Sequence, residues 1–129
     1  MVDITPRLSE ERQLIQSYGD GGFRIAGQDY TGSVLIEPET THSWPVHSAS
    51  AIDLASLAVL TDSRRDDQPG GAVLLIGTGK TITAIDPSLR VALRRFGFGV
   101  EIMDTGAACR TFNILLAEER NVVAALIAV

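Results

Sequence analysis

Cysteine, histidine and lysine are scarce in this sequence, and the scarcity of each of the first two excludes a class of site or protein. Cys109 is the only cysteine, so no disulfide can form within the chain and nothing indicates an oxidising compartment. The two histidines, His42 and His47, lie five residues apart, which suits neither a helical nor a strand-face pair of metal ligands. Lys80 is the only lysine beside ten arginines. We therefore predict no metal, and no motif indicates a cofactor.

Long apolar runs are also missing. The most apolar stretch, residues 122–129, is far shorter than the roughly 20 residues that a membrane helix needs. Residues 1–6 include Asp3 and have no long apolar core, so they do not resemble a signal peptide. We expect a cytoplasmic protein that does not span a membrane and carries no mitochondrial targeting extension.

The charge balance is acidic, with 16 acidic against 11 basic side chains and a formal net charge of −5. Proteins that bind nucleic acid need a basic face that displaces counterions from phosphates, so we predict no nucleic-acid partner. A length of 129 residues, 45% hydrophobic and 21% charged, is typical of a globular protein, and we predict one domain over residues 1–129.

The first third of the chain predicts β-structure after an irregular start. Residues 1–20 mix charged and apolar side chains, and we expect a flexible arm or a short helix beginning at Ser9. Alternating side chains predict strands at 23–25 and 30–36, followed by a short strand at 43–46. Together these strands predict an antiparallel N-terminal layer.

A short helix and an exposed loop are predicted next. Ser50 and Asp53 suit a helix start, and an apolar stripe follows that consists of Ile52, Leu54, Leu57 and Leu60. Residues 62–71 combine charged side chains with proline and glycine, which predicts an exposed loop.

The remaining sequence predicts a strand–helix–strand–helix–strand unit. Its segments are strand 72–76, helix 87–96, strand 100–103, helix 105–119 and strand 122–127. Asp86 suits the cap of the first helix, Leu89, Leu93 and Phe96 its buried side, and Gly97 its end. Helical crossovers require the three strands to be parallel. We predict an α/β fold with three layers, β/β/α, in which a parallel central sheet packs against the N-terminal antiparallel layer.

The loops after two of these strands, 77–81 and 104–107, form the candidate site. Ligands of parallel sheets bind beyond the carboxyl ends of the strands, and the helix that begins at Thr105 presents N–H groups and a positive dipole end. The predicted anion-binding residues are Gly77, Thr78, Gly79, Asp104, Thr105, Gly106, Cys109 and Arg110. Alternatively, Gly106 serves backbone shape alone, and Arg110 bridges the helix to an acidic neighbour such as Asp104.

No catalytic residue is predicted. The Gly-Thr-Gly-Lys-Thr string lacks the glycine that a phosphate loop requires five residues before Gly79, where Leu74 stands. Cys109 could be a nucleophile at a helix N-terminus, but it has no evident histidine partner, so we favour a structural role. It also adjoins the apolar stripe predicted for helix 105–119, which consists of Ala108, Phe112, Leu115 and Leu116. Asp104 suits a helix cap better than acid–base work, and Trp44 suits packing better than ligand stacking.

Several strings resemble one widespread family. They are Phe23-Arg24-Ile25, Tyr30, residues 32–36, Trp44, residues 74–79 and above all residues 101–113, Glu-Ile-Met-Asp-Thr-Gly-Ala-Ala-Cys-Arg-Thr-Phe-Asn. The family contains uncharacterised bacterial and archaeal proteins, the mitochondrial respiratory complex I assembly factor three and an adipogenesis-associated protein of animals. The resemblance runs from about residue 14 to the end and implies a three-layer β/β/α fold with a parallel central sheet.

Two functions compete at this point. The resemblance implies a non-enzymatic binding or assembly module with a protein partner, such as subunits of a respiratory membrane complex. The alternative is a small-anion-binding protein or enzyme that uses loops 77–81 and 104–110. Edge strands of the N-terminal layer would also allow a homodimer.

Overall fold

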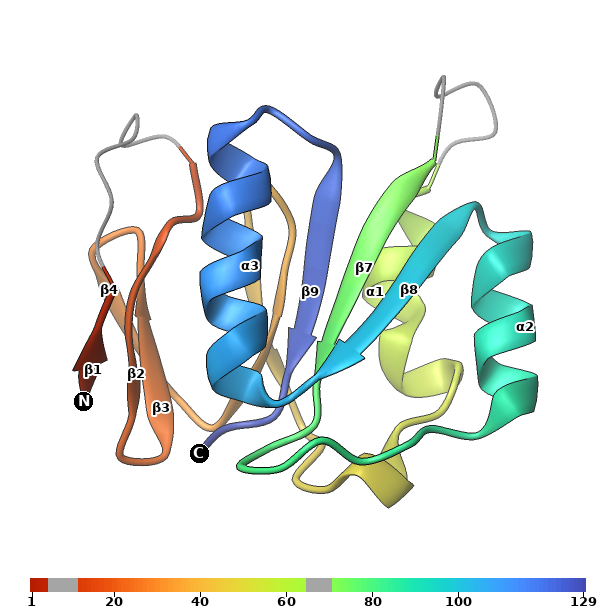
Figure 1. Ribbon diagram of the computed structural model, residues 1–129, viewed down its shortest axis with the longest axis horizontal. Coiled ribbons are helices and arrows are strands. Elements are labelled where there is room, and N and C mark those ends of the chain that lie inside the picture. Colours follow the sequence, from red (N-terminus) through yellow and green to blue (C-terminus); the bar gives the residue numbers. More distant parts are fainter. Residues whose placement is uncertain (5–11, 65–70) are drawn as a thin grey trace.

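Two β-sheets pack against one long helix in the computed structural model, which describes residues 1–4, 12–64 and 71–129 (Figure 1). The N-terminal sheet is antiparallel and has the order β1-β2-β3-β4, and the central sheet has the order β6-β5-β9-β7-β8. The N-terminal strands are β1 Val2–Asp3, β2 Ile15–Gly19, β3 Gly22–Ile25 and β4 Gln28–Thr31. The central strands are β5 Ser33–Ile36, β6 Thr41–Trp44, β7 Ala72–Gly77, β8 Phe98–Met103 and β9 Val122–Leu126.

The described helices are short except for the last. Two 3₁₀ turns, Ala49–Ala51 and Ala55–Leu57, lead into α1 (Ala58–Asp62). Helix α2 spans Pro87–Arg95, and α3 spans Thr105–Ala117. None of the helices in the described parts of the chain is long and apolar enough to cross a membrane.

The strand–helix–strand–helix–strand unit is confirmed. Strand β7 lies between β8 and β9 and pairs with both in parallel, with Leu75 opposite Glu101 and Ala124. Leu74, Leu75 and Ile76 of β7 are fully buried, as expected for a strand that is covered on both faces.

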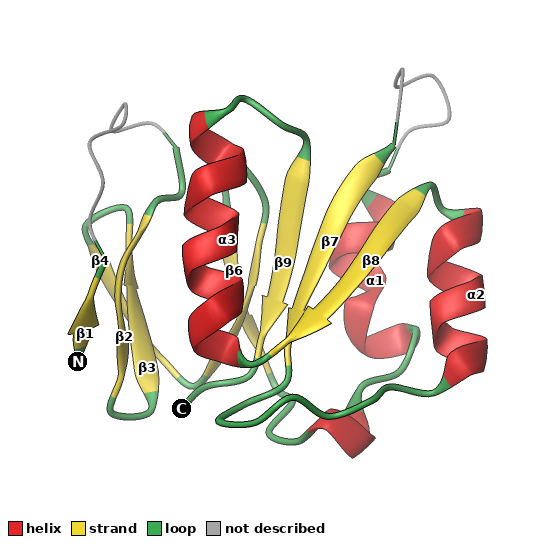
Figure 2. Ribbon diagram, in the orientation of Figure 1, coloured by secondary structure: helices red, strands yellow, loops and turns green. Residues whose placement is uncertain are grey.

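Three layers result, and helices contribute to two of them (Figure 2). Leu74 and Ile76 face a core that includes residues of α1 and α2. Leu75 points the other way, into a core shared with α3 and with strands β2 and β3 of the N-terminal sheet. The α/β class and the layered arrangement are therefore confirmed, with α3 lying beside the N-terminal sheet in its layer.

The N-terminal third differs from its prediction at Gly32. Its positive φ of 86° breaks the expected strand 30–36 into β4 and β5 and carries the chain from one sheet into the other. Strand β5 then pairs with β9 in antiparallel fashion and with β6, which lies at 41–44 rather than 43–46. The central sheet is consequently mixed, and the N-terminal layer lacks two strands that were predicted for it.

The prediction of an arm or helix for residues 1–20 is wrong where the structure describes them. Residues 15–19 form β2, and Val2 of β1 pairs opposite Tyr18. A register irregularity between Ile15 and Ser17 breaks the alternation of side chains, which hid this strand in the sequence. The helix start proposed at Ser9 lies outside the described residues.

Among the helix predictions, the capping residues agree best with the structure. Asp86 Oδ1 accepts a hydrogen bond from Ser88 N at 2.9 Å, which caps α2 and lowers the pKa of this carboxyl below its usual value. Phe96 follows the last helical residue and is 40% exposed, so its predicted burial is wrong. Leu54 is likewise exposed, because 3₁₀ turns replace most of the helix predicted from Ser50. Most of the loop predicted at 62–71 lies outside the described residues.

Trp44 packs as predicted. Its ring is buried in the core on the α1 side, and Nε1 donates a hydrogen bond to Ser56 O at 2.9 Å. The polar edge of the ring is therefore satisfied by backbone rather than by a ligand.

Asn113 ties α3 to the N-terminal sheet. Its Oδ1 accepts from Ile15 N at 3.0 Å, and its Nδ2 donates to Ile15 O at 2.8 Å, so one amide pairs with both backbone groups of a strand residue. The side chain is buried among apolar neighbours, including Phe112 of the same helix. Without this amide, two backbone groups of β2 would be buried and unpaired.

Replacing this amide is expected to be costly. Asn113→Leu keeps the volume but removes both hydrogen bonds, and we expect the free energy of unfolding to fall by about 3 kcal/mol. Thermal or urea unfolding measures the loss. Asn121→Leu is the matched control, because Asn121 is exposed and its side chain should change stability by less than about 0.5 kcal/mol. Equal midpoints for the two variants would contradict the role given to Asn113.

Candidate functional site

The structure brings the two predicted strand-end loops into direct contact. Thr105 N donates to Gly79 O at 2.9 Å, and Gly79 N donates to Thr105 Oγ1 at 3.0 Å. The residues expected at one site are therefore neighbours, as the parallel pairing of β7 and β8 requires.

The hydroxyl of Thr105 is the centre of this junction. It is fully buried, accepts from Gly79 N and donates to Ile127 O at 2.7 Å, while Ile127 N donates to Gly77 O at 2.9 Å. A methyl group at Gly77 would lie 2.9 Å from Thr105 Cα, so glycine is needed for this close approach. One side chain thus ties the carboxyl ends of β7, β8 and β9 together.

Thr78 also directs its hydroxyl into its own loop. Its Oγ1 lies 2.8 Å from Thr81 O and accepts a hydrogen bond from Thr83 N at 2.9 Å. The loop that follows β7 is therefore closed on itself by a buried threonine.

The start of α3 is largely satisfied by the protein. Among its first four N–H groups, Thr105 N donates to Gly79 O, Ala107 N to Asp104 Oδ1 at 2.9 Å, and Ala108 N to Asp104 O at 3.0 Å. Asp104 is a helix cap, as the sequence favoured. An anion at this helix start stays a prediction, and a geometry in which protein acceptors already occupy most of the N–H groups does not favour it.

Cys109 is a core residue. It is 0% exposed and packs with Ala108 and Phe112 between α3 and the sheets. Burial raises the pKa of its thiol from 9.0 to about 12, although the neighbouring Arg110 acts in the opposite direction. A thiol that stays protonated is a poor nucleophile, and its burial agrees with the structural role that the sequence favoured.

Arg110 does not bridge to Asp104. Its Nη1 donates to the Tyr18 hydroxyl at 3.0 Å, which links α3 to β2 a second time. A methyl group at Gly106 would lie 2.7 Å from that hydroxyl, so Gly106 leaves room for Tyr18. Arg110 itself stays exposed on the helix surface.

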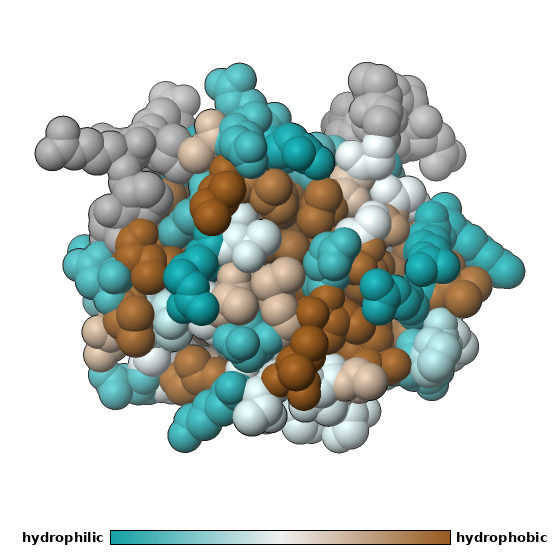
Figure 3. All heavy atoms as spheres, in the orientation of Figure 1, coloured by the Kyte–Doolittle hydropathy of each residue, from teal (hydrophilic) through white to brown (hydrophobic). Residues whose placement is uncertain are grey.

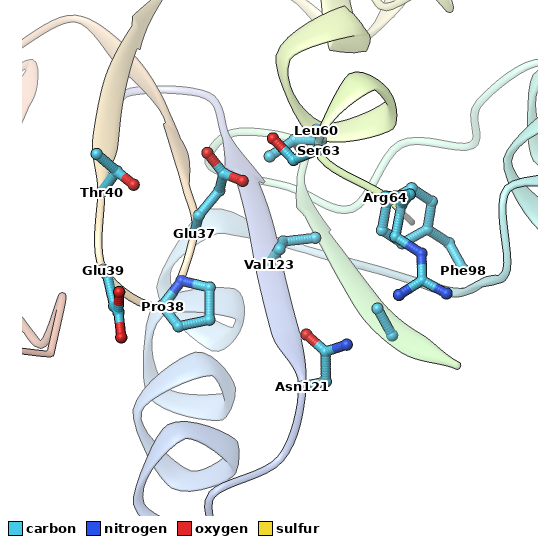
Figure 4. Close-up of a pocket in the computed structure, with 11 residues that line it drawn as sticks. Glu37, Pro38, Glu39, Thr40, Leu60, Ser63, Arg64, Phe98, Asn121 and Val123 are labelled. Carbon is cyan, nitrogen blue, oxygen red and sulfur yellow. The ribbon is translucent and has the colours of Figure 1, made fainter. Parts of the chain in front are cut away.

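A cavity that the sequence did not predict lies at the opposite ends of the parallel strands (Figure 4). It has a volume of about 300 Å³, and Figure 4 shows Glu37 and Glu39 on one side with Arg64 and Phe98 on the other. The Arg64 guanidinium lies 5.6 Å from the centre of the Phe98 ring, and its Nε donates to the backbone. Residues from separate elements meet here, so no local motif could have indicated it.

A second hollow runs along the outer side of α3. It has a volume of about 490 Å³ and is lined by Ile4, Arg110, Asn113, Ile114, Ala117 and Glu118. Ile114 is 60% exposed, which is unusual for a large aliphatic side chain in the middle of a helix. The sequence held a signal for it, because Ile114 falls outside the apolar stripe predicted for this helix.

Acidic, histidine and cysteine side chains do not gather into a set suited to a metal within residues 1–4, 12–64 and 71–129. His42 Nε2 lies 3.0 Å from Glu37 Oε1, and His47 is exposed on a loop. His42 therefore contacts a carboxylate, and His47 lies at the surface.

Comparison with known proteins identifies the family. The family described as "Protein of unknown function (DUF498/DUF598)" matches residues 15–127, nearly the whole described chain. The chain belongs to this family.

Members of the DUF498/DUF598 family with similar sequences come from animals and bacteria. A Xenopus tropicalis relative named NADH dehydrogenase (ubiquinone) 1 alpha subcomplex assembly factor 3 is 36% identical over 121 residues, 94% of this chain and 64% of that protein. An uncharacterised Rhodobacter capsulatus protein is 37% identical over 113 residues, 88% of this chain and 82% of that protein. The chain thus spans less than two thirds of the frog relative.

The fold is shared with solved bacterial structures. The solution structure of a Bordetella pertussis protein described as a Mth938-like domain superposes with a TM-score of 0.74 at 34% identity. The match covers 98% of this chain and 92% of that one. The layered fold is therefore shared with a similar bacterial protein of solved structure.

The Thr105 junction predicts a sharp effect of one hydroxyl. Thr105→Val keeps the shape but leaves Gly79 N and Ile127 O without their partner, and we expect a loss of about 3 kcal/mol in the free energy of unfolding. Thr111→Val on the same helix is the control, since Thr111 is only half-buried, and should change stability by less than about 0.5 kcal/mol. Chemical denaturation of both variants measures the difference, and similar stabilities would contradict the junction.

The Cys109 thiol is expected to react slowly and to couple to stability only at high pH. The folded pKa is raised to about 12 from 9.0, so above pH 9 the unfolded chain loses a proton that the folded chain keeps. Stability from this group is therefore complete below pH 9 and declines as pH rises toward 12. Maleimide or disulfide reagents should label the native protein far more slowly than the urea-unfolded protein. Equal labelling rates in the two states would contradict the burial of the thiol.

Proposed function

We propose that this protein is a non-enzymatic binding module that assists assembly of a respiratory membrane complex. The observation that carries the proposal is the similarity to proteins named as assembly factors of NADH dehydrogenase, at 36% identity over 94% of this chain. The similarity covers the part of the frog relative that corresponds to this fold, so an assembly role in that part is the simplest common function.

The chemistry of the predicted site supports a role without catalysis. Burial raises the pKa of the Cys109 thiol, Asp104 caps a helix, and Thr105 holds strand ends together. Each of these groups is used by the fold, and the polar groups of the two loops contact one another. A binding module needs surface instead, and the exposed side of α3 offers apolar area beside charge.

The partner that follows from this proposal is a subunit or assembly intermediate of the complex. Docking from the cytoplasmic side would need no membrane-spanning segment in this protein. Small-anion binding at the strand-end loops is the weaker candidate, because no contact of the described residues supports it.

Genetic depletion with rescue tests the proposal. Cells that lack this protein should contain less assembled NADH dehydrogenase complex in native gels, and their membranes should oxidise NADH more slowly. Wild-type protein supplied in trans should restore both, and affinity capture of tagged protein from detergent-solubilised membranes should enrich subunits of the complex. Normal complex content together with no enriched subunit would contradict the assembly role.

Two variants separate binding from chemistry in the same rescue. Cys109→Ala removes the sole thiol and should restore assembly fully if no thiol chemistry is involved. Arg110→Ala tests the anion site, because a folded variant that fails to rescue and no longer gains thermal stability with phosphate would favour that alternative. Thermal unfolding of each variant confirms that the fold is intact before the rescue is scored.

A further inference from the structure

The outer side of α3 carries a symmetric row of side chains. Arg110, Ile114 and Glu118 follow one another at intervals of four residues, which places them on one side of the helix at a rise of about 6 Å each. All three are exposed and line the same hollow. On the face drawn in Figure 3, apolar and pale side chains lie over α3 between hydrophilic ones.

Local helix stability does not account for these charges. The N-terminal half of a helix favours acidic side chains and its C-terminal end favours basic ones, yet Arg110 lies in the second turn and Glu118 at the C-cap. Within the described residues, neither is part of an ion pair. Arg110 donates one hydrogen bond to the Tyr18 hydroxyl of β2, which leaves its other N–H groups for an acceptor.

The row is complementary to itself. When two such helices lie antiparallel and cross at Ile114, a two-fold axis runs through the crossing point, and each Arg110 meets the Glu118 of the other copy. Such an isologous contact pairs the same surface on both copies. It also sets the two helix dipoles in opposite directions, which is the favourable arrangement.

We propose that this face of α3 binds a second copy of the chain, forming a two-fold symmetric dimer through antiparallel α3 helices. Ile114 contacts its counterpart at the centre, and two Arg110–Glu118 ion pairs flank it. Small side chains on α3, such as Ala107 and Ala117, allow the two helices to approach closely. This route uses a helix face and replaces the edge strands that the sequence suggested for dimer formation.

A second copy of the chain fits this face because it supplies the opposite charge for both Arg110 and Glu118. An unrelated helix would have to supply the mirror order of acid, apolar and basic side chains, whereas this chain already presents it. One pair of helices forms an interface at the small end of the known range, so we expect a dimer that dissociates on dilution.

Charge exchange tests the arrangement. The weight-average mass, measured by sedimentation or light scattering, should rise with concentration from 13.8 kDa toward twice that value. Arg110→Glu and Glu118→Arg place like charges together, and each alone should weaken association about tenfold or more. The double variant should dimerise again, and an equimolar mixture of the two single variants should form a heterodimer. Glu118→Arg leaves the Tyr18 contact untouched, and thermal unfolding of the dilute monomers checks that each variant is folded.

Thiol cross-linking places the axis. Ile114→Cys puts a thiol near the two-fold axis, so oxidation should give a covalent dimer, while the native Cys109 stays protected by burial. Val91→Cys on α2 is the matched control, with an exposed aliphatic side chain (48%) on the opposite side of the central sheet. A monomer at every concentration up to about 1 mM would overturn the proposal. So would single charge variants that associate as strongly as the wild type, or cross-linking at Val91→Cys that equals that at Ile114→Cys.

The dimer stands apart from the assembly role. A protein that self-associates but does not restore the NADH dehydrogenase complex in the rescue experiment would count against the assembly role alone. A protein that restores the complex but is monomeric at every concentration would count against the dimer alone.

Discussion

The burial of one side of α3 is the contact on which both sheets depend. Phe112 and Leu116 lie in a core formed by β2 and β3 on one side and by the central sheet on the other. Among the described residues, the outer strands β1 and β4 of the N-terminal sheet are largely exposed. Hydrogen bonds then determine how the helix sits in this core. Asn113 holds it to β2, and Thr105 joins its first residue to the ends of three strands. Apolar contact supplies most of the stabilisation, and these two polar side chains specify the position.

This arrangement explains what the two strand-end loops, 77–81 and 104–107, contribute. Their glycines allow backbones to approach closely, and their threonines and Asp104 satisfy backbone groups. In sequence these loops resemble a ligand site, because small side chains and hydroxyls lie beside a helix start. The same residue types are needed where three strands and a helix converge. The outer side of the same helix carries exposed side chains, so the fold and the proposed recognition use opposite sides of α3.

How far the sequence determines the structure varies along the chain. The C-terminal unit was predictable, since uninterrupted apolar strands alternate with capped helices, and Asp86 caps α2 as expected. The N-terminal strands were less so, because a register irregularity disturbs β2 and Gly32 moves the chain between sheets without any break in its β-forming residues. At the candidate site, contact between the two loops was predictable from parallel pairing. The partners were not: Arg110 contacts Tyr18, 92 positions away, and Asn113 pairs with Ile15, 98 positions away. Contacts between residues so far apart in the sequence are decided by tertiary packing, which no local sequence pattern indicates.

The position of β9 in the sheet has a consequence for biosynthesis. Strand β9 follows all the other described strands in the chain, yet it lies between β5 and β7 in the centre of the sheet. Until it is made, the β5–β6 hairpin and the β7–β8 pair are separate units, each with an unpaired inner edge. A ribosome-bound nascent chain therefore exposes apolar strand edges to other nascent chains, and the central sheet closes only when its last strand leaves the exit tunnel.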